Sequence, residues 1–258
     1  MSESTLSITR TEIYTALRRY LSYAPTGTLE TDQTNAIAAY TEDGENMFYK
    51  GTRLPGENSI HVWSFLKPVY GFSIIADDYT YTCPDDWGGF AGPTPVAGGN
   101  TYSDSIQVIP IEDLLELREY NSDLTAEYPT FIAQRPLARD QSTGQRFELV
   151  LYPTPTLSFT LSVKYVSNPS AIDNDAYYPL GGQPHALTLK KACIAAAELG
   201  ENDGAEGVQF REFMRLMADS VAFDRAVTTP SFFGQNLDRS TCRAFRRHRG
   251  RGVTLEDV

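Results

Sequence analysis

Two pairs of adjacent acidic residues, Asp77-Asp78 and Asp85-Asp86, are the clearest candidates for metal-dependent hydrolysis in this sequence. Carboxylates can hold a divalent cation, and a bound cation can activate water. Adjacent residues of a strand point to opposite faces, however, so each pair would present only one carboxylate to a site. Both pairs also stand where turns are expected, and Asp is favoured in turns because it bonds its own backbone. We therefore expect both pairs to be structural.

The histidines show no metal-ligand spacing. They are isolated in the sequence, and we expect them to be capping or surface residues. The chain also lacks a phosphate-binding P-loop, a dinucleotide-binding glycine fingerprint and a nucleophile elbow. We expect no enzyme activity and no catalytic, cofactor-binding or metal site. The three histidines are His61, His185 and His248.

Cys83, Cys193 and Cys242 are widely separated and odd in number, which argues against a disulfide framework and favours a reducing compartment. No Cys-x-x-Cys pair is present, so zinc binding is not expected. Cys193 follows the pair Lys190-Lys191 and could be a thiolate. A small apolar residue in an alanine-rich helix is more often a packing residue, and we expect that role for Cys193.

The composition is that of a globular protein. The chain has 258 residues, of which 41% are hydrophobic and 21% are charged, so it can bury a substantial core. It contains no run of eighteen apolar residues and no apolar stretch at its N-terminus. We therefore expect neither a membrane span nor a secretory signal.

The charge is unevenly placed. The net charge is −11, yet residues 239–258 hold six arginines and only two acidic residues, so the rest of the chain carries −15. Such an acidic body should repel nucleic acid. The basic end could contact phosphates, remain a solvated terminus, or dock on an acidic partner. Apolar residues among the arginines, Phe245 above all, favour docking slightly.

Helical periodicity predicts four main helices. The first follows Thr9, which has capping-box spacing to Glu12. The second is weakened in its middle by Gly44. The third opens around Pro184, which suits a first turn, and Gly200 stands where a C-terminal cap is expected. The predicted ranges are 9–22, about 31–49, 183–199 and 203–225.

The last two helices should form a hairpin, with Asp203 and Glu206 as a capping box for the second of them. Residues 195–197 are all alanine, so a neighbouring helix can approach closely there. The expected apolar positions of the third helix are Leu187, Ala192, Cys193, Ala196 and Leu199.

The sequence between the second and third helices is rich in β-forming residues. A hairpin of strands near 70–76 and 79–82 is predicted around Asp77-Asp78. Residues 146–152 and 158–166 both alternate and are predicted to pair with each other. Further strands are expected at 105–109 and 131–134, with a short helix at 111–120 between them.

The order of helices, strands and helices predicts an α+β fold. In this interpretation the N- and C-terminal helices form a bundle, and an antiparallel β subdomain, about 68–168, is inserted between them. Residues 1–230 would form the body, and residues 231–258 an extended basic arm.

Several motifs in order resemble one group of proteins. HVWSFLKP at 61–68, CPDDWGGFAGP at 83–93, LYPTP at 151–155 and YPLGGQPHALTLKKACIAAAE at 178–198 are similar to the head–tail adaptor, or head-completion, proteins of tailed bacteriophages. The resemblance implies a non-enzymatic virion subunit that forms a ring, usually of twelve copies, beneath the portal. Such a ring would seal the head, carry the tail or tail-completion protein and let DNA pass.

In this family the C-terminal segment commonly engages the portal. The resemblance therefore assigns portal docking to the arm, with assembly in the host bacterial cytoplasm, no membrane contact and no cofactor. The residues to which this role falls are Arg239, Arg243, Phe245, Arg246, Arg247, Arg249 and Arg251.

Two other functions fit parts of the sequence. A carbohydrate- or host-surface-binding module would explain the tyrosine-rich strands and the loop Trp87-Gly-Gly-Phe, although Trp87 stands among turn residues and we expect it to fill the sheet. A nuclease or hydrolase of the packaging machinery would have to use the acidic pairs. The adaptor is the leading hypothesis.

Overall fold

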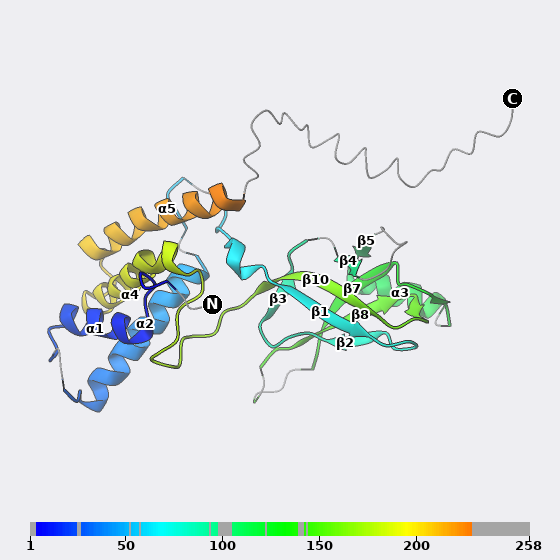
Figure 1. Cartoon of the computed structure of the whole chain (residues 1–258), viewed down its shortest axis with the longest axis horizontal. Coiled ribbons are helices and arrows are strands. Elements are labelled where there is room, and N and C mark those ends of the chain that lie inside the picture. Colours follow the sequence, from blue (N-terminus) through cyan, green and yellow to red (C-terminus); the bar gives the residue numbers. More distant parts are fainter. Residues whose placement is uncertain are drawn as a thin grey trace, which may run out of the picture.

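Helices from the two ends of the described chain pack together at one end of the molecule, and strands from its middle occupy the other end (Figure 1). The predicted α+β class is confirmed. This computed structural model describes residues 4–24, 27–51, 53–56, 58–92, 94–97, 105–121, 123–138, 142 and 144–228.

Five α-helices are present in the described residues, and each predicted helix appears. Two short 3₁₀ turns, η1 at Ser64–Leu66 and η2 at Gln183–His185, lead into the first strand and the fourth helix. The helices are α1 at Arg10–Tyr20, α2 at Thr31–Tyr49, α3 at Ile111–Tyr120, α4 at Ala186–Glu201 and α5 at Val208–Thr228.

Helix α4 is the centre of the helical core. It packs against α1, α2 and α5, and its alanines 195–197 are buried as the sequence predicts. A Cβ at Gly44 of α2 would collide with the Cα of Cys193, so the two helices touch backbone to backbone at this position. Gly44 therefore permits the close approach of α2 to α4. Cys193 itself is fully buried, and burial raises the pKa of its thiol well above the usual range.

The ends of three helices test the capping predictions. Thr9 and Glu12 form both bonds of the capping box of α1, as expected. Gly200 is not a cap, because α4 continues to Glu201 and Gly200 faces the ring of Tyr40. Leu187 is predicted to face the core, but it is 56% exposed and lies outside it.

Helix α5 begins later than the sequence pattern predicts. Asp203 and Gly204 have φ of 50° and 82°, which form a left-handed turn, and α5 begins only at Val208. The carboxylate of Glu198 in α4 accepts the amide of Phe210 at 2.8 Å. A residue of the preceding helix therefore caps α5, in place of Asp203 and Glu206.

Most of the strands join one mixed sheet in the order β1-β10-β4-β5-β7-β8-β2, with β3 paired to β10. Two short strands, β6 and β9, form a separate parallel pair. The strands are β1 Val69–Ile74, β2 Thr80–Thr82, β3 Trp87–Phe90, β4 Thr94–Ala97, β5 Ser105–Val108, β6 Thr125–Ala126, β7 Phe131–Pro136, β8 Phe147–Tyr152, β9 Thr154–Pro155 and β10 Phe159–Ser167.

The sequence predicts an antiparallel sheet, but the observed sheet is mixed, because β5 and β7 are parallel neighbours. Parallel neighbours require a crossover, and here the crossover contains α3. Leu114 of α3 is fully buried against Ala133, Val150 and Tyr152 of β7 and β8. The helix therefore covers part of one face of the sheet at the end of the molecule remote from α1 and α4 (Figure 1).

Two predicted strand pairings are wrong. The segments expected to form a hairpin, β1 and β2, pair instead with β10 and β8. The amide of Asp77, in the turn between them, donates to the carbonyl of Pro155. The strands β8 and β10 do not pair with each other, because the residues between them form β9, which pairs with β6.

The sheet curls, so that the end of its first strand lies near the start of its last strand. Only residues 75–79 separate β1 from β2, although these strands stand at opposite ends of the strand order. The hydroxyl of Tyr81 in β2 donates to the carbonyl of Ile75 at 3.1 Å and holds the turn between the two strands. The curled sheet encloses one core, to which β1, β8 and β10 contribute alternate residues such as Phe72, Leu149 and Leu161.

Candidate functional site

The seven residues expected to dock on the portal lie outside the described residues, as does all of the chain after residue 228. The described part of the molecule ends with α5, at the side of the helical core that faces the strands (Figure 1). The candidate site in the structure is therefore the region around the end of α5, together with the grooves on the surface.

Three residues of the acidic pairs, Asp77, Asp78 and Asp86, have structural roles, as predicted. Asp77 has φ of 67°, and the carboxylate of Asp78 accepts the amide of Thr80 at 3.2 Å, so the first pair shapes a turn. Asp86 accepts hydrogen bonds from the hydroxyls of Tyr165 at 3.0 Å and Ser167 at 2.6 Å. Its carboxylate thereby joins the turn before β3 to the end of β10.

Trp87 fills the sheet and does not form an exposed aromatic rim. It is 2% exposed, stacks on Tyr165 with ring centroids 4.9 Å apart, and donates its indole N–H to Gln134 at 3.1 Å. A sugar cannot stack on this indole, because the ring is buried and one of its faces is already covered by Tyr165. The tryptophan that suggested carbohydrate binding is therefore a core residue.

Within the described ranges, no group of three or more histidine, cysteine or acidic side chains could hold a metal ion. In the same residues, no helix combines the length and the apolar character that a membrane span requires.

The sequence predicts isolated histidines, but two of them, His61 and His185, lie in one cluster at the end of α5. The imidazole Nε2 of His61 is 2.7 Å from the carboxylate of Asp224 in α5. Ser64 donates both its amide, at 3.1 Å, and its hydroxyl to the same carboxylate. Burial alone would raise the pKa of Asp224, but the bonds from Ser64 and His61 outweigh it and hold the pKa below its usual value.

Serine, histidine and aspartate are the residues of a hydrolytic triad, but their order here is wrong for catalysis. A nucleophilic serine needs the imidazole as its direct base, with the carboxylate behind the imidazole. In this cluster the carboxylate of Asp224 lies between Ser64 and His61. The cluster therefore fixes the end of α5 to the segment that leads into β1.

That segment is also held by aromatic packing. Trp63 is fully buried and donates its indole N–H to the carbonyl of Phe48 at 2.9 Å. His185 is 4% exposed and lies 5.0 Å from the ring of Trp63, and Phe65 stacks on the same indole. Burial lowers the pKa of His185. The first connection between helices and strands is thus built into the helical core.

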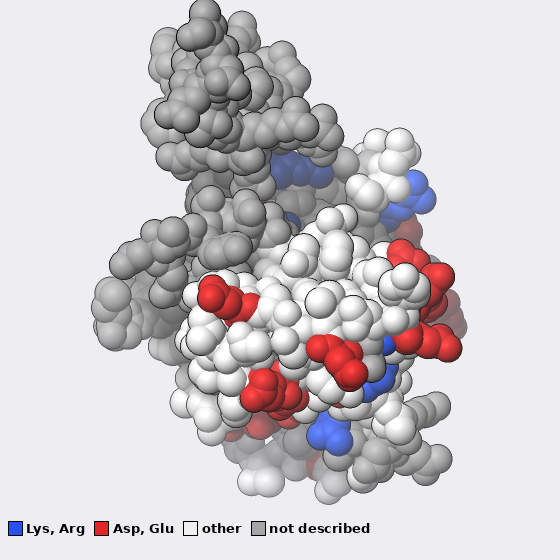
Figure 2. Space-filling view, turned by 90° about the vertical axis from the view of Figure 1, so that its right-hand side faces the viewer, with Lys and Arg blue, Asp and Glu red and all other residues white. Residues whose placement is uncertain are grey.

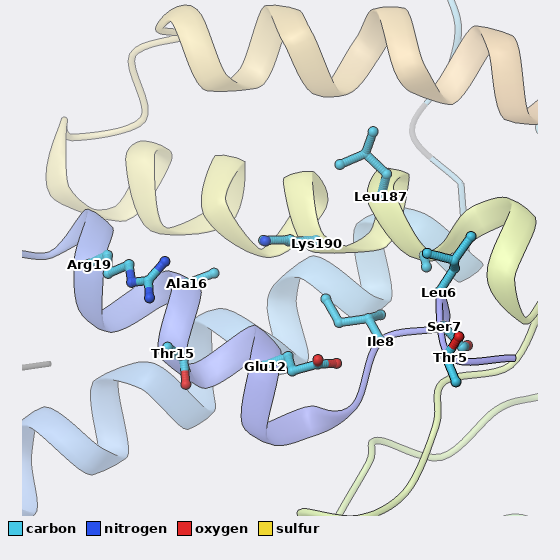
Figure 3. A pocket seen from close by; sticks show the side chains of 11 residues that line it. Thr5, Leu6, Ser7, Ile8, Glu12, Thr15, Ala16, Arg19, Leu187 and Lys190 are labelled. Carbon is cyan, nitrogen blue, oxygen red and sulfur yellow. The ribbon is translucent and has the colours of Figure 1, made fainter. Parts of the chain in front are cut away.

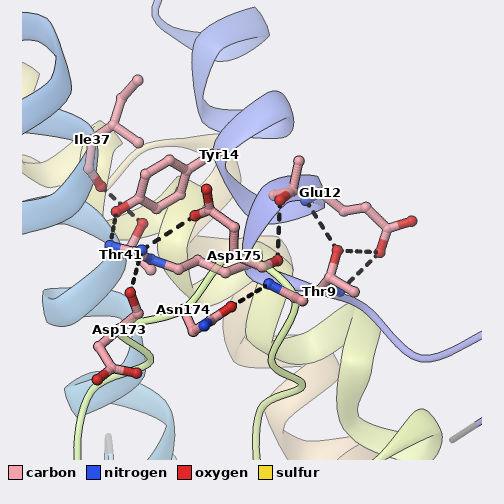
Figure 4. A network of polar contacts seen from close by, with 11 residues as sticks. Thr9, Glu12, Tyr14, Ile37, Thr41, Asp173, Asn174 and Asp175 are labelled. Carbon is pink, nitrogen blue, oxygen red and sulfur yellow. Dashed lines mark hydrogen bonds and ion pairs between the residues drawn. The ribbon is translucent and has the colours of Figure 1, made fainter. Parts of the chain in front are cut away.

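The second connection, from β10 back to η2, is held by polar contacts to α1 and α2 (Figure 4). Arg10 donates to the carbonyl of Asp173 at 2.8 Å and to the carboxylate of Asp175 at 3.2 Å. The amide of Ile172 donates to the carboxylate of Glu45 at 3.2 Å. Both connections are therefore fastened to the helices by several independent bonds.

Glu45 is the most unusual ionisable group of the second connection. It is 3% exposed, and its Oε1 atom has no hydrogen-bond partner among the described residues. Burial raises the pKa of Glu45 to about 7, although the amide of Ile172 and the charge of Arg10 act in the opposite direction. Near neutral pH this side chain is therefore poised between its neutral and charged forms.

One groove on the surface lies between residues 5–8, α1 and α4 (Figure 3). It has a volume of about 470 Å³ and is lined partly by the exposed side chains of Leu6 and Leu187. Arg19 of α1 and Lys190 of α4 lie in it, and its acidic residue, Glu12, is already bonded in the capping box. The groove therefore has a mixed polar and apolar lining with a basic character.

A second groove, also of about 470 Å³, lies between α5 and the segment at Leu54-Pro55. Its lining is mainly apolar and includes Leu54, Met214 and Val221. Its charged lining residues are the basic Arg215 and Arg225. Basic side chains thus line both grooves on the helical core, although only the second groove is mainly apolar.

A third groove, of about 500 Å³, lies along α3 at the opposite end of the molecule. Acidic side chains are scattered among uncharged ones on this end, together with a few basic ones (Figure 2). The helix exposes Leu117 and Tyr120, and Tyr120 is 92% exposed. We call the surface formed by Ile109, Asp113, Glu116, Leu117, Tyr120 and Phe131 the α3 groove.

A family model described as SU10 adaptor protein matches residues 8–231, which contain every helix and strand of the structure. A search of curated proteins finds no match. The matched range ends before Arg239, so the basic residues of the arm lie beyond it. The adaptors of this family are structural proteins of the phage particle and interact with other head and tail proteins. The chain belongs to the SU10 adaptor protein family, a family of phage head–tail adaptors.

Proposed function

We propose that this protein is a non-enzymatic ring subunit that docks beneath the portal, helps to seal the head and offers a platform for the tail. Twelve copies would form the ring, assembled in the host cytoplasm, and DNA would pass through its centre. Residues 1–230 would form the body of the subunit and residues 231–258 the arm.

The observation that carries this proposal is the family match across both ends of the fold. The fastened connections also support it, because a platform under load needs its two ends to move as one piece. Apolar side chains exposed on several surfaces, such as Leu6, Leu187 and Tyr120, suit a subunit that is covered on assembly.

The charge distribution fits the same role. An acidic body with a net charge of −15 would not retain DNA that slides past it. The arginines of the arm would instead engage carboxylates or carbonyls of the portal, which arginine does through several donors at once. We assign this docking to Arg239, Arg243, Phe245, Arg246, Arg247, Arg249 and Arg251.

Co-sedimentation with the cognate portal ring tests the proposal. We expect the full-length chain to sediment with the portal in ring stoichiometry at modest salt. A full-length variant with Arg243→Glu, Arg246→Glu and Arg247→Glu should remain in the supernatant, because three docking charges are reversed.

A chain cut after Asp238 is the second test and should also fail to sediment. If both altered chains bind as the wild type does, the body carries the contact and the arm has another role. If the wild type itself does not bind at modest salt, the proposal that it docks on the portal is wrong.

A further inference from the structure

The α3 groove has an apolar floor and an acidic edge. Asp113, Glu116, Leu117 and Tyr120 follow the spacing i, i+3, i+4 and i+7, so they lie on one face of the helix. Opposite this face, Ile109 and the half-buried Phe131 complete the floor. Two carboxylates and two large apolar side chains therefore point along one hollow, which suits a segment that combines basic and apolar residues.

The two other grooves described above do not suit such a segment. The groove between α1 and α4 contains Arg19 and Lys190, and the groove along α5 contains Arg215 and Arg225. Basic side chains in a groove repel an arginine-rich ligand. The α3 groove has acidic side chains and no Lys or Arg among its described lining residues.

This chain itself supplies a segment of the complementary composition. Residues 239–251 contain six arginines and no acidic residue, and Phe245 stands in the middle of them. The segment is tethered to the end of α5, and seventeen residues lead from Thr228 to Phe245. Extended chain of that length reaches up to about 60 Å.

We infer that in the subunit free of the portal the α3 groove binds residues 239–251 of its own chain. Phe245 occupies the apolar floor beside Leu117 and Tyr120, and the arginines on either side of it face Asp113 and Glu116. A tethered segment binds at a high effective concentration, so several weak contacts suffice.

This inference goes beyond the proposed function, because it concerns the subunit before it meets the portal. It gives the arm two alternative sites, the α3 groove and the portal. A docking arm that is held in the free subunit is withdrawn from non-specific contact with nucleic acid, to which its arginines would otherwise bind.

Cross-linking in the full-length protein tests the contact. Cys242 belongs to the basic segment, whereas Cys83 and Cys193 are buried. A cysteine introduced by Asn121→Cys stands next to Tyr120 and leaves all six groove residues in place. With a short bis-maleimide, we expect Asn121→Cys to link to Cys242 about fivefold faster or more than Leu187→Cys, which lies in a basic groove.

Charge reversal in the groove provides the matched comparison. Asp113→Lys with Glu116→Lys should slow the cross-link of Asn121→Cys about fivefold or more, because both acidic partners are reversed. Glu112→Lys with Glu119→Lys changes the same helix by the same charge but alters no lining residue of the groove. It should change the rate by less than about twofold, and salt of about 1 M should slow the cross-link in every chain.

Three results would overturn the inference. They are equal rates at Asn121→Cys and Leu187→Cys, an equal effect of the two charge-reversed pairs, and a product of the size of two chains. Thermal unfolding of each variant shows that the fold is kept, as expected for exposed positions. Co-sedimentation with the portal separates this inference from the proposed function, because the Asp113→Lys, Glu116→Lys variant should still bind the portal.

Discussion

Glu45 shows how one buried carboxyl can link the pH to the fold. The folded protein raises its pKa from 4.5 to about 7, with burial as the main cause. A carboxyl whose pKa is raised on folding favours the folded state only while it is protonated. Its contribution is therefore complete below about pH 4.5 and is lost as the pH rises through 7. A shift of this size corresponds to about 3 kcal/mol of stability.

We predict that Glu45→Gln stabilises the protein at pH 8 by about 1–3 kcal/mol and has little effect at pH 4.5. The glutamine side chain carries no charge, and its oxygen can still accept a hydrogen bond from the backbone N–H of Ile172. Urea unfolding at both pH values measures the difference. Glu42→Gln, an exposed neighbour on α2, should change the stability by less than about 0.5 kcal/mol at either pH. A gain that is the same at both pH values would contradict the prediction.

At the residue scale, local patterns could be read from the sequence and long-range partners could not. The capping box of Thr9 and Glu12 lies within one turn, so its spacing alone predicts it. The turn positions of the acidic pairs were predictable for the same reason. His61 and Asp224 are 163 residues apart, and no local signal joins them. Their contact appears only after the helices have packed.

Among the elements, α4 has the strictest packing requirement. Small residues on it allow α2 to approach until a glycine in α2 meets the backbone of α4. Glycine normally weakens a helix by about 1 kcal/mol relative to alanine, so its position here has a packing reason. The sequence showed Gly44 as a weak point of the helix, while the structure shows that it is a contact point.

We predict that Gly44→Ala destabilises the protein by about 2 kcal/mol, because the added methyl group meets the backbone of Cys193 and overpacks the contact. Gly200→Ala, in α4, is the matched control. Its methyl group meets the ring of Tyr40, which is the end of a half-buried side chain and can shift more easily than backbone, so the change should stay within about 1 kcal/mol. Thermal and urea unfolding measure both changes. Equal losses in the two variants would contradict this account.

The helices were predictable because their apolar period is a local property, and all four main ranges correspond to observed helices. Strand positions were also largely predictable, but strand partners were not. Alternation in β8 and β10 shows that each has a buried face, and it does not show which strand lies beside it. Partners are chosen by the curl of the whole sheet and by side pairs such as β6 with β9.

The whole molecule has separate cores in its helical and sheet regions. Trp63 belongs to the core of the helices and Trp87 to the core of the curled sheet, and no described residue belongs to both clusters. Among the described residues, two fastened connections lead from one region to the other. Each tryptophan therefore reports on one end of the molecule.

We predict that Trp63→Phe lowers the stability of the helical end by about 2 kcal/mol, because it removes the bond to Phe48 and leaves a void. The fluorescence of Trp87, the remaining tryptophan, should keep its midpoint in urea, while the loss of helical circular dichroism shifts to lower urea. Trp87→Phe should instead lower the stability of the sheet end, while the fluorescence of Trp63 and the helical circular dichroism keep their midpoints in urea. If both signals shift together, the two ends unfold as one unit.

The placement of α2 and α4 on either side of the strands also determines the order in which the chain can fold during synthesis. The strands are contiguous in sequence and can pair as soon as residues up to Ser167 have left the ribosome. The face of α2 that packs against α4 must wait until α4 emerges, more than a hundred residues later. For that interval the nascent chain carries a helix with an uncovered apolar face, which makes it a natural client for a chaperone.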